Sequence, residues 1–129
     1  MNLNIAICDD DTNDIAIMKK NILQYTIETD NNIVVSSYFS ASDILSDYKN
    51  HLYQIVLLDI EMEGMNGYQA AEELNKLPDI PLIIFITQSG AYIIRGYEVA
   101  FRYLKKPVEY PDFVRAVSAA VAKCSPKSI

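Results

Sequence analysis

Short apolar segments alternate with helical segments along the chain, and this alternation constrains the fold more than any other feature. We predict five β-strands, at residues 3–8, 33–38, 54–58, 82–86 and 101–104. Helical segments are predicted at residues 12–27, 40–49, 67–77 and 91–97, and from residue 111 onward. Because the strands are continuously apolar, the sheet should be parallel and covered by helices on both faces. The sequence therefore predicts an α/β fold, a doubly wound (βα)5 sandwich.

Length and composition limit the classes of function that this fold can serve. The chain has 129 residues, half of them hydrophobic, which suits one domain with a full core. Its net charge of −6, without a basic stripe, argues against direct nucleic-acid binding. Neither a signal peptide nor an apolar run of the roughly 18 residues that span a membrane is found. Cys8 and Cys124 fit free thiols in a reducing compartment, so we expect a cytoplasmic domain without membrane contact.

Polar residues follow the predicted strands at the points where the strands end. Asp9 and Asp10 end the first strand, Asp59 the third and Thr87 the fourth, and Lys106 lies just beyond the fifth. The carboxyl ends of parallel strands meet at one edge of a sheet, where ligands bind. We therefore expect carboxylates, a hydroxyl and an ammonium group to lie together at this edge.

Crowded carboxylates repel one another unless a cation lies between them. Mg²⁺ is the natural candidate, since it prefers oxygen ligands, keeps several waters and completes its shell with phosphate oxygens. Asp59, flanked by apolar residues, is positioned as a carboxylate nucleophile that would form an aspartyl phosphate. Lys106 would neutralise charge on the phosphoryl group and Thr87 would offer it a hydroxyl.

Taken together, these residues resemble the receiver domain of bacterial two-component response regulators. The matching pieces, in chain order, are Asp9-Asp10, Asp59, the turn from Met62 to Gly67, Thr87, and Tyr103 to Lys106-Pro107. The resemblance covers essentially the whole chain. It implies a flavodoxin/CheY-like five-stranded sheet in the order 2-1-3-4-5. We expect a receiver domain at residues 1–124, with 125–129 as a tail or the start of a linker.

The resemblance implies a role for each acid. Asp59 would accept a phosphoryl group from a sensor histidine kinase. Asp9, Asp10, Asp59 and the backbone carbonyl of Glu61 would hold Mg²⁺. The protein would be a phosphoacceptor regulator, with only weak autocatalytic phosphotransfer and autodephosphorylation, rather than an enzyme.

The resemblance also implies a switch. Lys106 would pair with the phosphoryl group, and its peptide bond to Pro107 would be cis. Thr87 would move toward the phosphoryl group and Tyr103 would rotate inward. These movements would alter the face formed by helix 91–97, strand 101–104 and the last helix, which could also form a homodimer. Glu61 and Ser89 occupy the positions that tune phosphoryl lifetime.

Two positions depart from the common family pattern. Glu63 stands where proline is frequent, and Gln88 stands where a small residue usually follows the switch threonine. The larger Gln88 side chain could narrow access for small phosphodonors. Neither departure touches the acceptor chemistry.

The segments 7–11 and 101–108 are similar to receivers that precede a LytTR-type DNA-binding domain. The output would then be transcription, controlled through an effector domain outside this chain. Two alternatives remain: a stand-alone receiver that acts on a protein partner or in a phosphorelay, and a receiver that docks without being phosphorylated.

Other classes and other residues fit less well. A haloacid-dehalogenase-like phosphatase needs aspartate where this chain has Glu61, and a flavodoxin-like cofactor binder needs a hydroxyl- and glycine-rich loop after the first strand. His51, the single histidine, is predicted to lie away from the site. Asp11 is expected to do no more than favour a helix start. An apolar patch is expected on helix 91–97, formed by Tyr92, Ile93, Ile94 and Tyr97.

Overall fold

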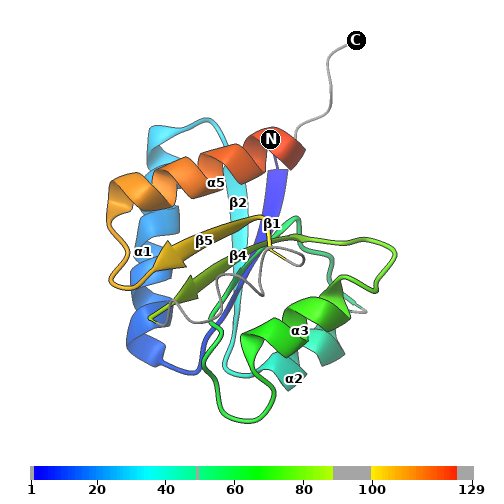
Figure 1. The fold of residues 1–129 in the computed structure, drawn as a ribbon. Coiled ribbons are helices and arrows are strands. Elements are labelled where there is room, and N and C mark those ends of the chain that lie inside the picture. The colour runs from blue at the N-terminus through cyan, green and yellow to red at the C-terminus, as the bar shows by residue number, and fades with distance from the viewer. Residues whose placement is uncertain (1, 49, 89–99, 125–129) are drawn as a thin grey trace.

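The computed structural model describes residues 2–48, 50–88 and 100–124, which form one sheet flanked by helices (Figure 1). The strands are β1 (Asn2–Cys8), β2 (Asn32–Tyr38), β3 (Ile55–Leu58), β4 (Leu82–Thr87) and β5 (Arg102–Lys105). All neighbouring strands pair in parallel, in the order β2-β1-β3-β4-β5. The predicted parallel doubly wound fold is therefore confirmed, including the strand order.

The described helices are α1 (Thr12–Glu28), α2 (Ala41–Asp47), α3 (Gly67–Leu74) and α5 (Tyr110–Cys124). Local side chains explain where three of them begin. Asp11 caps α1 by accepting hydrogen bonds from the backbone of Asn13 and Asp14, and Ser40 caps α2. Asn66 and Gln69 form a reciprocal capping box at the start of α3.

Two hydrophobic clusters lie on opposite faces of the sheet. α1 and α5 cover one face, where Ile7, Leu57 and Ile86 point toward Phe113 and Val117. α2 and α3 cover the other face. Its cluster contains the alternate strand residues Ala6, Cys8, Val56, Leu58, Ile83 and Phe85. The four residues of β3 are all buried, as expected for a central strand with helices on both sides.

The boundaries of the described elements agree with the predictions to within two residues, except at the end of α3. The predicted helix reached residue 77, but α3 ends at Leu74. Lys76 and Leu77 instead donate backbone hydrogen bonds three residues back, to Glu73 and Leu74, which is the tighter geometry of a frayed last turn.

Some predictions fall outside the described residues: the helix at 91–97 with its apolar patch, and the tail at 125–129. Within the described ranges, none of the helices combines the length and the apolar character that crossing a bilayer requires.

Candidate functional site

The backbone of the sheet brings the first and third strand ends together. Cys8 of β1 pairs in register with Leu58 of β3, so Asp9 and Asp59 follow as neighbours. The Asp59 backbone N–H donates to the Cys8 carbonyl at 2.9 Å, and the Asp9 N–H donates to the Tyr38 carbonyl at 3.0 Å. The backbone of both residues is thus held by hydrogen bonds that continue the pairing of the sheet beyond the strand ends.

Three carboxylates converge at this point. Asp9, Asp10 and Asp59 each offer an oxygen, and these oxygens lie within 4.8 Å of one another. Asp9 and Asp59 are only 5% exposed, whereas Asp10 is exposed and accepts a hydrogen bond from the Glu63 backbone at 3.3 Å. A set made only of carboxylates, with one side open to solvent, suits a hard cation such as Mg²⁺ that retains water.

Burial and mutual repulsion disfavour the charged forms of these acids. Burial, reinforced by the charge on Asp9, raises the pKa of Asp59 to about 7, although Lys106 acts in the opposite direction. Burial also raises the pKa of Asp9, against the effect of hydrogen bonds from the Asp11 backbone and from Lys106. A cation bound here would relieve the cost of holding these carboxylates charged.

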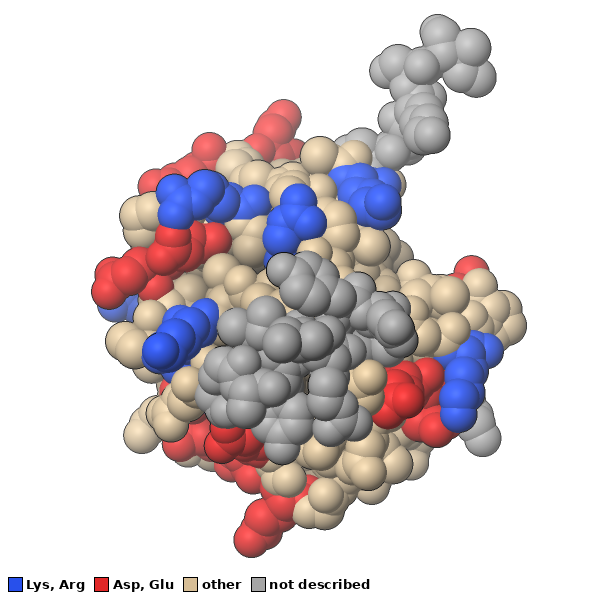
Figure 2. All heavy atoms as spheres, in the orientation of Figure 1, with Lys and Arg blue, Asp and Glu red and all other residues tan. Residues whose placement is uncertain are grey.

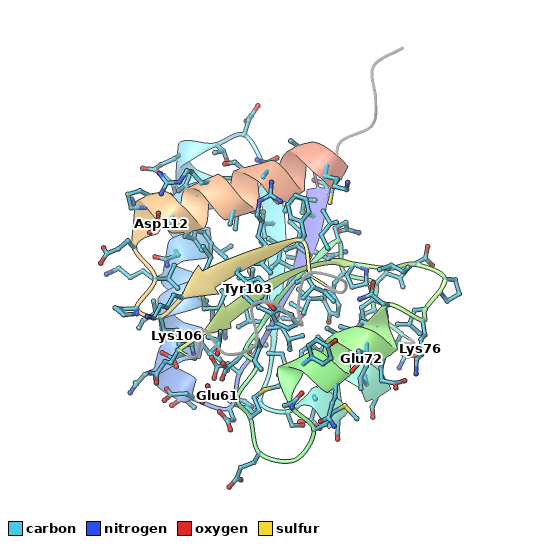
Figure 3. All side chains as sticks on the ribbon, viewed as in Figure 1. Glu61, Glu72, Lys76, Tyr103, Lys106 and Asp112 are labelled. Atoms are coloured by element: carbon cyan, nitrogen blue, oxygen red, sulfur yellow. The ribbon has the colours of Figure 1, made fainter. Side chains whose placement is uncertain are left out.

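Lys106 enters the cluster from just beyond β5 (Figure 3). Its Nζ lies 2.8 Å from Asp14 Oδ2, 2.9 Å from Asp9 Oδ2 and 3.6 Å from Asp59 Oδ2. Burial lowers the pKa of Lys106, but the hydrogen bonds to Asp14 and Asp9 outweigh it, and the net shift is upward. The Lys106-Pro107 peptide bond is cis, as expected.

Asp14 is the one residue of this cluster that the sequence reasoning did not find. It lies in the first turn of α1, where an acid commonly does no more than complement the helix dipole. No local sequence pattern marks its role, because the contact depends on how the first turn of α1 lies against Lys106, 92 residues later in the chain. We call Asp9, Asp10, Asp14, Asp59 and Lys106 together the carboxyl edge.

Thr87 and Tyr103 connect the carboxyl edge to the β4–β5 side of the sheet. Thr87, at the end of β4, is 2% exposed, and its carbonyl accepts the Lys106 backbone N–H at 2.9 Å. Tyr103 on β5 is half-buried, and its ring centroid lies 5.2 Å from that of Phe85 on β4. Thr87 and Tyr103 therefore lie on adjacent strands.

The loop from β3 to α3 packs against the backbone of Asp59. Gly67 packs so closely that a Cβ there would lie 2.0 Å from the Asp59 carbonyl oxygen, so only glycine fits. Its N–H donates to the Ile60 carbonyl at 2.8 Å. Gly64, at φ +75°, makes the left-handed turn in the same loop. The predicted turn through Gly67 thus fixes the backbone that carries Asp59.

A cavity of about 210 Å³ opens beside the two buried acids. Its walls include Asp9, Asp59, Lys106, Gln88 and Ile17. Gln88 therefore lies where the sequence expectation put it, beside the access to Asp59. Ile17, half-exposed on α1, adds an apolar rim.

Most of the predicted site residues meet at this edge, with a few exceptions. Asp9, Asp10, Asp59, Thr87 and Lys106 lie at the carboxyl ends of the strands. Glu61 follows two residues after Asp59, in the loop that leads to α3. Ser89 lies outside the described residues. His51 is in the connection after α2, 3.9 Å from Asp47, and takes no part in the carboxyl edge.

Comparison with known proteins agrees with this geometry. The family model described as the response regulator receiver domain matches residues 5–118. An uncharacterized response regulatory protein of Vibrio cholerae is 32% identical over 95 residues, which are 73% of this chain and 33% of that protein. The sensory transduction protein LytT of Bacillus anthracis is 26% identical over 117 residues, 89% of this chain and 46% of that protein. The chain thus spans less than half the length of these relatives.

Solved structures share the fold at low sequence identity. The response regulatory domain of mrkE from Klebsiella pneumoniae superimposes with a TM-score of 0.80 at 19% identity, covering 94% of this chain and 97% of that one. The response regulator TrrA from Thermotoga maritima, in complex with Mg(2+)-BeF, gives 0.80 at 22% identity, covering 92% and 98%. Together, the family match over most of the chain and the shared fold establish that this chain belongs to the response regulator receiver domain family.

Proposed function

We propose that this chain is a phosphorylation-controlled switch in which Asp59 accepts a phosphoryl group from a sensor histidine kinase. One observation carries the proposal: Asp59 is a buried carboxylate that lies 3.6 Å from the Lys106 ammonium and shares a cluster with two further acids. An ordinary turn aspartate would be exposed and would need neither partner. Membership in the receiver family supports the same conclusion.

Mg²⁺ is the cofactor that the donor set fits. Asp9, Asp10 and Asp59 would hold it with their carboxylates, and Glu61 would contribute its backbone carbonyl. When bound, the ion would neutralise charge on the acids and on the entering phosphoryl group. The TrrA structure in complex with Mg(2+)-BeF supports this assignment by analogy.

The chain itself needs to perform only one chemical step, the transfer of the phosphoryl group to Asp59. A carboxylate oxygen of Asp59 attacks the phosphorus of a phosphohistidine, the new O–P bond forms, and the P–N bond breaks. The imidazole leaves and takes up a proton from solvent. Lys106 then pairs with a phosphoryl oxygen and the Thr87 hydroxyl donates to another. Autocatalytic dephosphorylation would be slow, with its rate tuned at Glu61 and Ser89.

The signal would pass from Thr87 to Tyr103 and then to the surface formed by β5 and α5. Tyr103 is half-buried against Phe85, so inward rotation would change what this surface presents. Figure 2 shows Lys and Arg side chains over β5 and α5. The exposed basic residues of these two elements include Arg102, Lys105 and Arg115. This surface, together with residues 91–97, is the proposed site of homodimer contact.

The proposed output is transcription, through a LytTR-type effector domain outside this chain. Matches to relatives named LytT and LytR, of which this chain covers less than half, support the assignment. We expect the switch to act in the cytoplasm, where its free Cys8 and Cys124 would stay reduced.

Amide NMR with Mg²⁺ and the phosphoryl mimic beryllofluoride tests the switch. We expect shifts near Asp59 and Thr87 that spread to Tyr103, and no such response in Asp59→Asn, which keeps the shape but not the charge. A response in Asp59→Asn would refute Asp59 as the acceptor. Mg²⁺-dependent shifts without any response to the mimic would instead favour a receiver that docks without being phosphorylated.

A further inference from the structure

A fourth carboxylate, that of Asp14, reaches the carboxyl edge from α1 and takes the closest contact with Lys106. We propose that Asp14 is a positioning residue: it retains Lys106 away from the acceptor in the unphosphorylated protein and so weakens binding of a phosphoryl group at Asp59. The inference rests on the proposed function. In this account Lys106 favours binding of the phosphoryl group, and Asp14 opposes it by holding the Lys106 ammonium group.

The distances define the retained state. Lys106 Nζ lies 2.8 Å from Asp14 and 2.9 Å from Asp9, both within hydrogen-bond range. Its 3.6 Å separation from Asp59 lies beyond that range, so the contact is an ion pair only. Two of the three ammonium protons are thus committed to other acids before a phosphoryl group arrives.

A purely structural role for Asp14 does not explain this contact. Asp14 is the third residue of α1, and an acid at that position commonly accepts the backbone N–H of the capping residue. Here the capping residue, Asp11, donates its N–H to Asp9 Oδ1 at 2.9 Å. The Asp14 carboxylate is turned instead toward Lys106, a residue 92 positions away in the sequence.

The backbones of Asp14 and Lys106 are both held by hydrogen bonds, so the ion pair between their side chains should contribute more than a flexible surface pair would. The Asp14 backbone donates to the Asp11 cap at 3.1 Å, and the Lys106 backbone donates to the Thr87 carbonyl at 2.9 Å. The side chains are 27% and 10% exposed, respectively. Exposed ion pairs contribute little, but this lysine is largely withdrawn from water and cannot easily exchange its partners for solvent.

Asp14 opposes a phosphoryl group in two ways. Lys106 must give up at least part of its bond to Asp14 before it can pair with the new phosphoryl oxygens. The Asp14 carboxylate also adds a like charge on the wall of the cavity that the phosphoryl group enters. Asp14 is not one of the three clustered carboxylates Asp9, Asp10 and Asp59, so a cation held by those three would need no ligand from it.

Beryllofluoride binding at saturating Mg²⁺ tests the proposal, with four proteins compared by amide NMR titration. Asp14→Asn should bind the mimic about three- to tenfold more tightly than the wild type. Asp14→Glu keeps the charge and should stay close to the wild type. Asp11→Asn is the matched control, because it removes one charge from the same turn, keeps a capping side chain and should change affinity by less than about twofold.

A second readout reports on the retained state directly. The Lys106 ammonium resonance of the metal-free protein should shift in Asp14→Asn and not in Asp11→Asn. A helix-dipole role for Asp14 would move the unfolding midpoint and leave this resonance in place.

Each outcome is decisive. Unchanged or weaker beryllofluoride binding by Asp14→Asn, beside a responsive wild type, overturns the inference and leaves the proposed function standing. Binding by Asp14→Asn but not by the wild type supports retention in its strongest form. If neither protein binds the mimic, the proposed function and the inference fall together.

Discussion

Two polar clusters lie against the same sheet, and they differ in whether their polar groups are balanced by partners within the protein. Around α2, Tyr38 donates to Asp47 and contacts the Tyr53 hydroxyl, and Tyr48 donates to the carbonyls of Tyr53 and Asp79 at 3.2 Å each. We call Tyr38, Asp47, Tyr48 and Tyr53 the tyrosine cluster. At the carboxyl edge, four carboxylates face one ammonium group. The tyrosine cluster satisfies its polar groups internally, whereas the carboxyl edge holds excess negative charge that only a ligand would offset.

This difference separates structure from function within one fold. The aromatic rings of the tyrosine cluster also pack against one another, with ring centroids 6.1 Å apart for Tyr38–Tyr53 and 5.8 Å for Tyr48–Tyr53. Changes there should cost stability. Some changes at the carboxyl edge should increase stability, because proteins keep local conflicts of this kind where function requires them.

The largest effect should come from the backbone beneath the carboxyl edge. Gly67→Ala would place a Cβ 2.0 Å from the Asp59 carbonyl oxygen, and we expect it to lower the free energy of unfolding by about 3 kcal/mol or more. Urea denaturation measures the change. Gly64→Ala is the control: it meets no atom within 4 Å but must keep φ at +75°, and should cost about 1 kcal/mol. Equal losses in both variants would mean that close packing behind Asp59 is unimportant.

Asp59→Asn should stabilise the metal-free protein. Burial raises the Asp59 pKa to about 7, so at pH 8 the native state must hold an unfavourable buried charge. We expect the amide to raise the free energy of unfolding by roughly 1–3 kcal/mol in the presence of a chelator. A destabilised Asp59→Asn protein would contradict the view of this edge as a site of stored repulsion.

The same cause predicts the pH dependence of the wild type. The native Asp59 pKa of about 7 exceeds the ordinary value of 3.8, so between these limits the native state binds more protons than the unfolded state. Stability of the metal-free protein should therefore fall as pH rises through this window. Asp59→Asn should show a flatter profile in chelator, measured by thermal unfolding. Parallel profiles for the two proteins would exclude Asp59 as the source.

A change in the tyrosine cluster should lower the free energy of unfolding, in contrast to the increase expected for Asp59→Asn. Tyr48→Phe removes a hydroxyl that donates to two carbonyls, and should lower the free energy of unfolding by about 1 kcal/mol. The loss should be the same at pH 5.5 and pH 8, since no carboxylate contacts that hydroxyl among the hydrogen bonds of the described residues. A strongly pH-dependent loss would show that the two clusters are coupled.

Sequence periodicity predicted the fold well because buried parallel strands and amphipathic helices leave strong patterns. It also placed Asp9, Asp59, Thr87 and Lys106 at one edge, since strand ends in a parallel sheet are defined by topology alone. The Asp14–Lys106 contact could not be predicted in the same way. It depends on how the first turn of α1 faces a loop 92 residues later, which no local pattern encodes. The tyrosine cluster was not predicted for a similar reason, because it joins residues of β2, of α2 and of the connection between α2 and β3.

The central claim is that Asp59 carries the phosphoryl group, and chemical trapping tests it most directly. The protein is incubated with Mg²⁺ and acetyl phosphate, reduced with borohydride, and digested for peptide mass mapping. An aspartyl phosphate is reduced to homoserine, so we predict that residue 59 alone is converted, and that Asp59→Asn shows no conversion. Conversion at Asp9, Asp10 or Asp14 instead, or no conversion while beryllofluoride binds, would contradict the account.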